Sequence, residues 1–213
     1  CYRSEEIETS PFLRVLLQPS PTAYSALERR DLSVDALTHS EAHDLALALL
    51  ARDDEATKAS AETIARESGG NPFFVYELVH RSTTSVPIAD RTSETRNLTL
   101  DNVIWERVLG LPEPARRLLE AVAVSGHPLE QSEAYHAAEL VGEDQAALAT
   151  LRSGRLIRST GPTDQTEIET YHDRIRETVL AHLQPAALRE CHRRIAVALE
   201  KSGRADLGQL NDS

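Results

Sequence analysis

The chain has 213 residues, of which 40% are hydrophobic and 27% are charged, as is usual for a globular domain. Its formal net charge of −11 at pH 7 argues against non-specific binding to nucleic acid or to an anionic membrane surface. No apolar run approaches the ~20 residues that a bilayer-spanning helix requires, so neither nucleic acid nor a membrane is an expected partner.

The cysteine and methionine content indicates the redox environment of the chain and suggests that the chain is part of a longer protein. Cys1 and Cys191 form no C-x-x-C pair and are too few for a disulfide framework, which favours a reduced, cytoplasmic setting. Cys191 falls on the apolar face of a predicted helix and is expected to be a small core residue. The chain contains no Met and opens on Cys-Tyr-Arg, which is typical of a fragment of a longer protein.

The first part of the chain predicts short helices separated by polar segments. The opening CYRSEE is typical of a strand tail that runs into a loop, and residues 11–17 predict a short helix that ends before Pro19. Thr38 followed three residues later by Glu41 is a capping-box signature and predicts the start of a second helix. The expected buried face of that helix repeats at helical spacing: Ala42, Leu45, Ala46, Leu49 and Leu50.

A tight corner within ESGGNPFFVYELVHR is expected to join two further helices. The first helix should cover residues 55–68, and Gly69-Gly70 supplies a residue that can adopt a positive φ and end it. Asn71 is a favoured N-cap, and Pro72 occupies the first helical position, where its missing N–H costs nothing. The inward positions of the two helices are predicted to be Ala56, Ile64 and Ala65, then Phe74 with Leu78 and Val75 with Val79.

A polar segment over residues 83–99 lacks hydrophobic periodicity and is the expected linker between two modules. The helical subdomain before it covers residues 20–82. The module after it covers residues 100–183, and residues 184–213 begin a C-terminal helical region.

In the second module the sequence pattern changes from that of helices to that of a β-hairpin and then back to that of helices. The predicted helices are, in chain order, DNVIWERVLG, PEPARRLLEAVAVSG, LEQSEAYHAAEL and GEDQAALATLRSG. RLIRST and TEIETYH, separated by GPTDQ, then predict a β-hairpin, and helices resume at DRIRETVLAHL and PAALRECHRRIAVALEKSG. Three helices followed by a two-stranded wing is the order of a winged-helix domain. The predicted fold class is therefore mainly α, with a helical subdomain, a winged helix with a small β-hairpin, and C-terminal helices.

The sequence lacks the motifs for ATP hydrolysis and for a zinc protease site. No phosphate-binding loop G-x-x-x-x-G-K-[ST] occurs, and no apolar strand ends in paired carboxylates that could hold Mg²⁺, so this stretch alone should not hydrolyse ATP. His39 and His43 have helical i, i+4 spacing, but the Glu of the zinc protease motif H-E-x-x-H is absent, since Ser40 follows His39 and Asp44 follows His43. Two solvated polar residues are therefore favoured over a metal site.

DNA binding is also not expected of the winged-helix module. Its third helix, which a DNA-binding version inserts in the major groove, carries only Arg152 as a base. Residues 101–177 hold fourteen acidic and eight basic side chains, a net charge of −6 that the phosphate backbone would repel. Arg152, Arg155 and Arg158 form a small local patch that is interpreted as a solvated face.

Three separated motifs together resemble one family. ESGGNPFFVYELV resembles the lid segment of the signal-transducing ATPases with numerous domains, the STAND branch of the AAA+ superclass, and in particular the bacterial predicted ATPases fused to Ser/Thr protein kinases, nucleotide cyclases or transcription regulators. YRSEE resembles the residues after the sensor 1 strand, and TYHDRIRETVLAHL resembles the end of the winged-helix domain. The resemblance covers roughly residues 1–200, in the family's order and spacing.

The resemblance implies a nucleotide site that this chain completes. Gly70, Asn71 and Pro72 would start a lid helix whose proline packs near the adenine. His172 would approach the β-phosphate in the closed, ADP-bound form, and Arg3 can face the terminal phosphate. Tyr171 departs from the pattern, because related plant and animal proteins carry Met there.

Residues 1–19 would, by the same resemblance, be the end of a nucleotide-binding core, and residues 20–82 would be the lid. ATP or ADP would be the cofactor, with Mg²⁺ bound only through an upstream phosphate-loop domain. That domain, an effector domain and C-terminal helical repeats would be the partners. Whether the longer protein is an enzyme stays open, and this fragment is expected to be inactive alone.

The physical chemistry of these residues suits the implied roles but also permits simpler ones. A proline at a helix start offers a rigid apolar surface to a purine, and a histidine at a helix N-terminus adds a donor beside the positive end of the helix dipole. Asn71-Pro72 can equally be only a cap, His172 only a neighbour of a cap, and Arg3 only a surface charge. The alternative function is a nucleotide-independent helical scaffold that binds a protein partner, and a DNA-binding regulator is a weaker third option.

Overall fold

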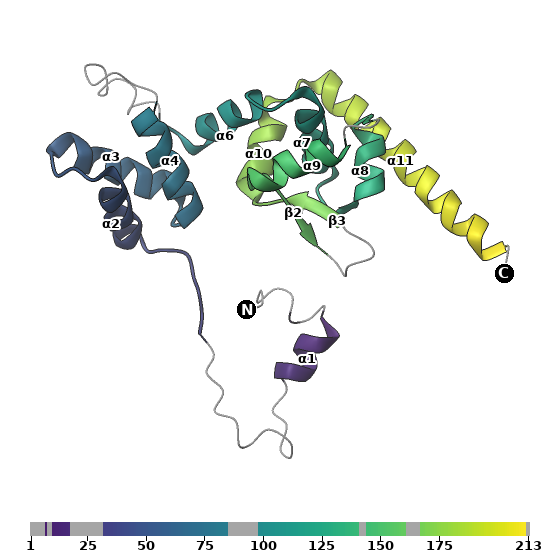
Figure 1. Cartoon of the computed structure of the whole chain (residues 1–213), viewed down its shortest axis with the longest axis horizontal. Coiled ribbons are helices and arrows are strands. Elements are labelled where there is room, and N and C mark those ends of the chain that lie inside the picture. Colours follow the sequence, from purple (N-terminus) through teal and green to yellow (C-terminus); the bar gives the residue numbers. More distant parts are fainter. Residues whose placement is uncertain are drawn as a thin grey trace, which may run out of the picture. The chain divides into compact units, whose positions relative to one another are not determined.

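The computed structural model describes Ile7 and residues 10–17, 32–84, 98–140, 144–160 and 167–211. The described chain is mainly helical with a small three-stranded antiparallel sheet, which confirms the predicted fold class (Figure 1). It divides into two compact units, Cys1–Asp35 and Ala36–Ser213. None of the helices in the described ranges combines the length and the apolar character that a bilayer crossing needs.

The first unit contains the short helix α1, Pro11–Leu17, as the sequence predicts. Leu13 is buried, whereas Phe12 and Val15 are largely exposed. The predicted strand tail and Arg3 lie outside the described residues.

The second unit begins with three helices, α2 (His39–Leu50), α3 (Glu55–Ser68) and α4 (Pro72–Thr84). The predicted capping box starts α2: the Thr38 hydroxyl accepts the Glu41 N–H at 3.3 Å, and the Glu41 carboxylate accepts the Thr38 N–H at 2.8 Å. These hydrogen bonds, chiefly the one from the Thr38 N–H, lower the pKa of Glu41. The linker expected over residues 83–99 falls largely outside the described residues, since α4 runs to Thr84 and description resumes at residue 98.

The buried faces of α2 and α3 differ in part from the prediction. In α2 only Ala42 and Ala46 are fully buried, and Leu49 is 40% exposed. In α3 Thr57 rather than Ala56 is buried, and the Asp54 carboxylate caps the helix by accepting the Thr57 N–H at 2.7 Å.

The predicted corner between α3 and α4 forms. Gly69 has φ 56° and Gly70 has φ 79°, both in the left-handed region. The Asn71 side chain accepts the Phe73 N–H at 3.0 Å and so caps α4. The face of α4 that contains Phe74, Val75, Leu78 and Val79 is buried, as expected.

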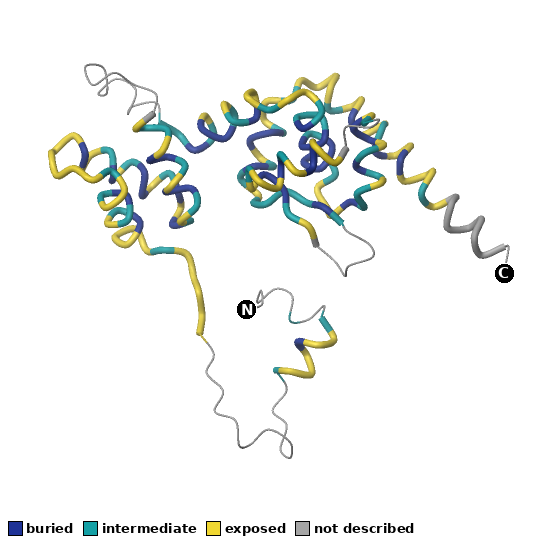
Figure 2. The backbone as a smooth tube through the Cα atoms, in the orientation of Figure 1, coloured by how far each residue is buried: buried dark blue, intermediate teal, exposed yellow. Residues whose placement is uncertain are grey.

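The rest of the unit has the helix and strand order of a winged helix. The elements are α6 (Leu100–Leu109), α7 (Glu113–Ser125), β1 (Leu129–Glu130), α8 (Gln131–Ala137), α9 (Asp144–Ser153), β2 (Ile157–Thr160), β3 (Glu167–Thr170), α10 (Asp173–His182) and α11 (Pro185–Asn211). The sheet order is β1-β3-β2, and both pairings are antiparallel. Figure 2 shows buried positions, in dark blue, recurring along these helices and strands.

The strand β1 was not predicted. Leu129 and Glu130 were expected to begin a helix. Instead Leu129 pairs with Ile168 and Glu130 with Glu167, on the side of β3 opposite β2. Pairing with a distant strand outweighs local helix preference here, and α8 begins two residues later than expected.

Candidate functional site

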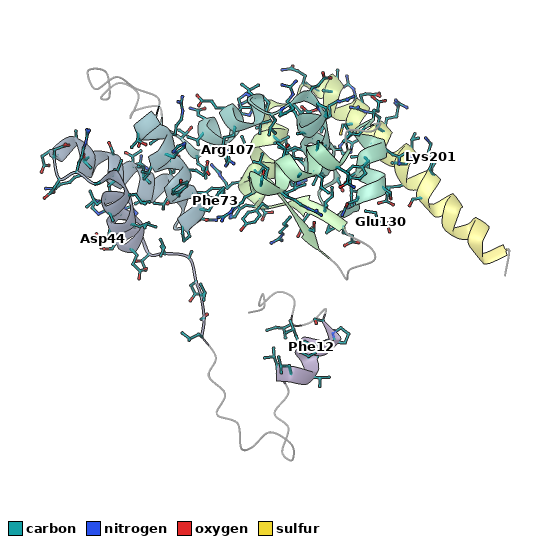
Figure 3. The ribbon with its side chains drawn as sticks, viewed as in Figure 1. Phe12, Asp44, Phe73, Arg107, Glu130 and Lys201 are labelled. Carbon is teal, nitrogen blue, oxygen red and sulfur yellow. The ribbon has the colours of Figure 1, made fainter. Side chains whose placement is uncertain are left out.

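The N-terminus of α4 contacts the segment that leads from β3 into α10. The rings of Phe74 and His172 meet edge to face, with centroids 4.8 Å apart and planes at 72°. Beside them the rings of Phe73 and Tyr171 lie with centroids 6.0 Å apart. The corner at Pro72 and the histidine, one hundred positions apart in sequence, therefore belong to one junction, and Figure 3 labels Phe73 within it.

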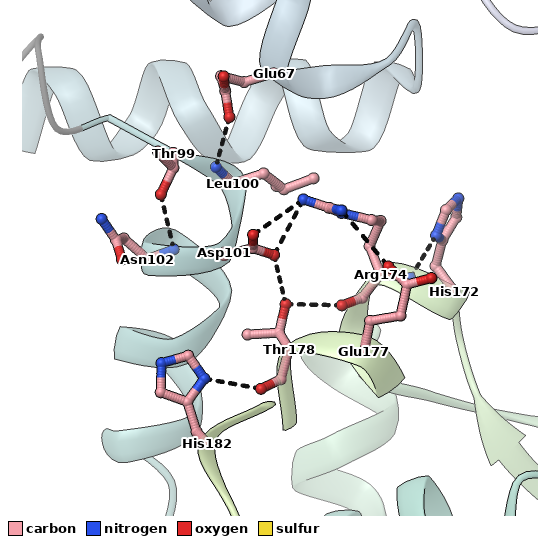
Figure 4. Close-up of polar contacts among 10 residues, drawn as sticks. All are labelled: Glu67, Thr99, Leu100, Asp101, Asn102, His172, Arg174, Glu177, Thr178 and His182. Atoms are coloured by element: carbon pink, nitrogen blue, oxygen red, sulfur yellow. Dashed lines mark hydrogen bonds and ion pairs between the residues drawn. The ribbon is translucent and has the colours of Figure 1, made fainter. Parts of the chain in front are cut away.

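His172 is the N-cap of α10 and has an extended backbone, with φ −153° and ψ 147°. Its Nδ1 accepts the backbone N–H of Arg174 at 3.2 Å (Figure 4). Because Nδ1 is an acceptor, a neutral ring carries its proton on Nε2, which is then a hydrogen-bond donor. The ring is thus oriented from one side by the cap and from the other by Phe74.

A polar network joins α6 to α10 next to this histidine. Asp101 lies 3.1 Å from the Arg174 guanidinium and accepts the hydroxyl of Thr178 at 2.9 Å (Figure 4). Arg174 also lies 3.5 Å from the carboxylate of Glu177. Because the helix that carries His172 is held to α6 by these contacts, the position of the imidazole depends on them.

Two arginines from the winged-helix side approach Phe73. The Arg107 guanidinium carbon lies 5.8 Å from the ring centroid, and that of Arg155 lies 5.5 Å from it. Arg107 is also fixed by Glu77 of α4, with Nη1 2.9 Å from Oε2, and donates to the carbonyl of Gly154 at 2.6 Å. Arg107 therefore connects α4 to the end of α9.

The junction encloses a small crevice with a mainly apolar lining. Its walls come from α4, α6, α10 and the residue before β2: Phe73, Phe74, Glu77, Leu100, Val103, Ile104, Arg107, Leu156 and Ile175. It has room for about one water molecule at most. A purine therefore has no place inside this crevice, and any larger ligand would contact the outer rim of the junction.

The residues predicted for a site have different environments. Pro72 is exposed on the surface, whereas Gly70 is buried and its carbonyl accepts the Leu37 N–H at 2.9 Å. Asn71 is engaged as a cap, His172 is partly buried, and Arg3 lies outside the described residues. Phe73 and Phe74, the two residues after Asn71-Pro72, are the ones that contact Tyr171 and His172.

Sequence reasoning did not assign Phe73, Glu77, Arg107 or Arg155 to this site. Phe73 is off the apolar stripe of α4, and its neighbours come from residues far along the chain. The one local signal was the pair of adjacent aromatic residues in a chain with few aromatics.

A second group of ionisable residues lies between α7 and α11, away from this junction. Cys191 is buried, as predicted, and burial raises the pKa of its thiol to about 11. Burial also raises the pKa of Glu120, against the opposing effect of nearby arginines. No cluster of three or more possible metal ligands occurs in the described ranges.

The comparisons with known proteins give no assignment. No protein-family model and no curated protein sequence matches this chain.

Proposed function

We propose that this chain is the lid and winged-helix part of a STAND-type signalling ATPase that works in the cytoplasm. In this proposal the chain closes over ATP or ADP held by an upstream phosphate-loop domain. The observation that supports it best is the contact between the Phe74 and His172 rings, at 4.8 Å, because it joins the two motifs that the resemblance assigns to one nucleotide.

The available surfaces suit the two ends of a nucleotide. Pro72 is exposed and rigid and can lie against a purine. A neutral His172 offers Nε2–H to a phosphate oxygen, because Nδ1 is already used by the cap. The nucleotide would lie on the rim of the junction, with the missing part of its site supplied by the upstream domain.

A switch requires that the nucleotide contact the two conformations unequally. In the closed state the α4 corner and the histidine would contact ADP together. Exchange of ADP for ATP would loosen the winged-helix module from the nucleotide and change the output of an effector domain. The moving boundary would be the one between α4 and the winged helix, which the Phe74–His172 and Glu77–Arg107 contacts hold shut.

The test is ADP retention by a protein that contains this chain together with its upstream region. His172→Asn keeps a side-chain oxygen that can cap α10 but removes the imidazole donor. We expect this variant to release ADP faster and to melt within a few degrees of the wild type. His127→Ala, which changes an exposed histidine before β1, is the matched control and should retain ADP normally.

The alternative function, a nucleotide-independent scaffold, predicts a different result. Under that alternative His172→Asn and His127→Ala would behave alike, and no ADP would copurify with either protein. Absence of a phosphate-binding loop from the residues before Cys1 would also remove the proposed function.

A further inference from the structure

The contact between α7 and α11 contains ionisable side chains that the proposed nucleotide site does not use. Helix α11 buries Cys191, Ile195 and Ala198 where it packs on α7 and α8. Glu120 of α7 is partly buried next to Cys191. Among the described residues, none donates a hydrogen bond to the Glu120 carboxyl group, and none forms an ion pair with it. A partly buried carboxyl group without a donor is costly to ionise.

Two hydrogen-bond donors at the same contact lack an acceptor. The Nε–H groups of Arg117, on α7, and Arg194, on α11, are buried, and within the described part of the chain neither makes a hydrogen bond. Carboxylate oxygens of Glu113 and Glu190 lie 3.9 Å and 3.8 Å from the two Nε atoms, which is too far for a hydrogen bond. Buried donors are rarely left unpaired, because each then loses its hydration without compensation. The contact therefore holds a carboxyl group without a donor beside donors without an acceptor.

Three helices contribute ionisable groups around Glu120. These groups are Arg116 and Arg117 from α7, Glu190, Cys191 and Arg194 from α11, and Glu139 from the end of α8. Burial raises the pKa of Glu120 above its ordinary value of 4.5, and this effect exceeds the opposing effect of the three arginines. The thiol of Cys191 stays neutral over the acidic and neutral pH range, since its pKa is raised to about 11. The arrangement described here thus suits a neutral Glu120.

An ionised Glu120 would gain from a different arrangement. A carboxylate oxygen that accepted the Nε–H of Arg194 would form a charge-assisted hydrogen bond and would satisfy a buried donor. The two side chains come from different helices, so this bond changes the position of α11 on α7. Glu139, 3.3 Å from Nη1 of Arg194, leaves the Nε–H of that arginine available.

We propose that Glu120 is a proton-dependent latch between α7 and α11. The neutral carboxyl group keeps the arrangement described here. Ionisation releases the proton to solvent, brings the carboxylate to the Nε–H of Arg194 and shifts α11. The latch is independent of the proposed function, and it controls the position of the helix that leads out of the winged-helix module.

NMR of the 213-residue chain tests the latch from about pH 4 to about pH 8. The Glu120 carboxyl carbon and the Arg194 Nε–H should titrate together, with one midpoint above pH 4.5. Backbone amides from Cys191 to Ala198 should shift with that midpoint, because α11 moves. The Nε–H of Arg176 donates to the Ala123 carbonyl at 3.1 Å and is the internal control, which should not follow this midpoint.

Two variants identify the titrating group. Glu120→Gln keeps the side chain neutral at every pH with nearly the same size, so the Arg194 signal should lose its titration step. Glu139→Gln removes the other carboxylate that contacts Arg194, and the step should remain.

Four results would overturn the latch. They are an Arg194 signal that does not titrate in the wild type, a step that survives Glu120→Gln, a shared midpoint at or below pH 4.5, and a step confined to the two side chains without a shift of the α11 amides.

Discussion

Gly70 lies against the backbone of Leu37. The Leu37 N–H donates to the Gly70 carbonyl at 2.9 Å, and a Cβ added to Gly70 would overlap the Leu37 carbonyl oxygen. The corner before α4 is therefore fixed both by its own left-handed backbone and by the segment that enters α2.

Gly70→Ala should destabilise the second unit more than Gly69→Ala. Both positions have positive φ, which costs about 1–2 kcal/mol for a side-chain-bearing residue. Only Gly70 adds a backbone overlap, worth about 1–3 kcal/mol more, because nothing lies within 4 Å of a Cβ at Gly69. Urea denaturation of the two variants measures the difference, and equal losses would contradict the close approach to Leu37.

Glu77→Gln should weaken the attachment of α4 to the winged helix. The Glu77 and Arg107 side chains are 17% and 29% exposed, so loss of the ion pair should lower the free energy of unfolding by about 1–2 kcal/mol. Glu106→Gln is the control, because its pair with Arg81 joins the same two helices with 50% and 38% exposed side chains. We expect about 0–1 kcal/mol there, and a larger loss for Glu106→Gln would contradict the prediction.

Asp101 and Thr178 should be energetically coupled. The hydroxyl of Thr178 donates to Asp101 at 2.9 Å across the α6–α10 contact. A double-mutant cycle with Asp101→Ala and Thr178→Val should give a coupling free energy of about 1 kcal/mol by chemical denaturation. A control cycle that pairs Asp101→Ala with Ser60→Ala, on α3, should give no coupling free energy. Additive effects in both cycles would contradict an energetic contribution of the Asp101–Thr178 hydrogen bond.

Cys191 should resist alkylation in the folded chain. Burial raises the pKa of its thiol from 9.0 to about 11, so at pH 8 the thiolate is about 100-fold rarer than in the unfolded chain. Peptide mass spectrometry after iodoacetamide treatment, with denatured chain as the control, measures the rate. Fast labelling of Cys191 without denaturant would contradict its burial.

The raised pKa of Cys191 also predicts that the folded chain loses stability at alkaline pH. The folded chain holds the Cys191 proton more tightly, so the contribution of this group to the free energy of unfolding is lost as pH rises from about 9 to about 11. Cys191→Ala should remove that part of the alkaline dependence.

The elements that local chemistry specifies could be predicted from the sequence. The capping box at Thr38, the left-handed glycines and the Asn71 cap each act within four residues, and each forms as expected. The order of helices and strands in the winged helix also followed from periodicity and turn residues. The prediction was wrong where the secondary structure of a segment depends on a partner far away in the sequence. At β1, pairing with β3 overrides a local preference for helix.

The candidate site was only partly predictable for the same reason. Its members Asn71, Pro72 and His172 came from a family resemblance, and the helix-capping roles of Asn71 and His172 are local. The contacts of Phe73 with Tyr171, Arg107 and Arg155 depend on how α4 packs on the winged helix, which no local pattern encodes.

The long helix α11 continues beyond the residues that attach it to the winged-helix module. Its buried residues Cys191, Ile195 and Ala198 attach it to the module, while the helix continues to Asn211 (Figure 1). At 1.5 Å per residue its 27 residues measure about 40 Å, so a module tilt of about 10° would swing its far end by about 7 Å. A tilt of that size would therefore move the far end of α11 by more than the ~5.4 Å of one helical turn.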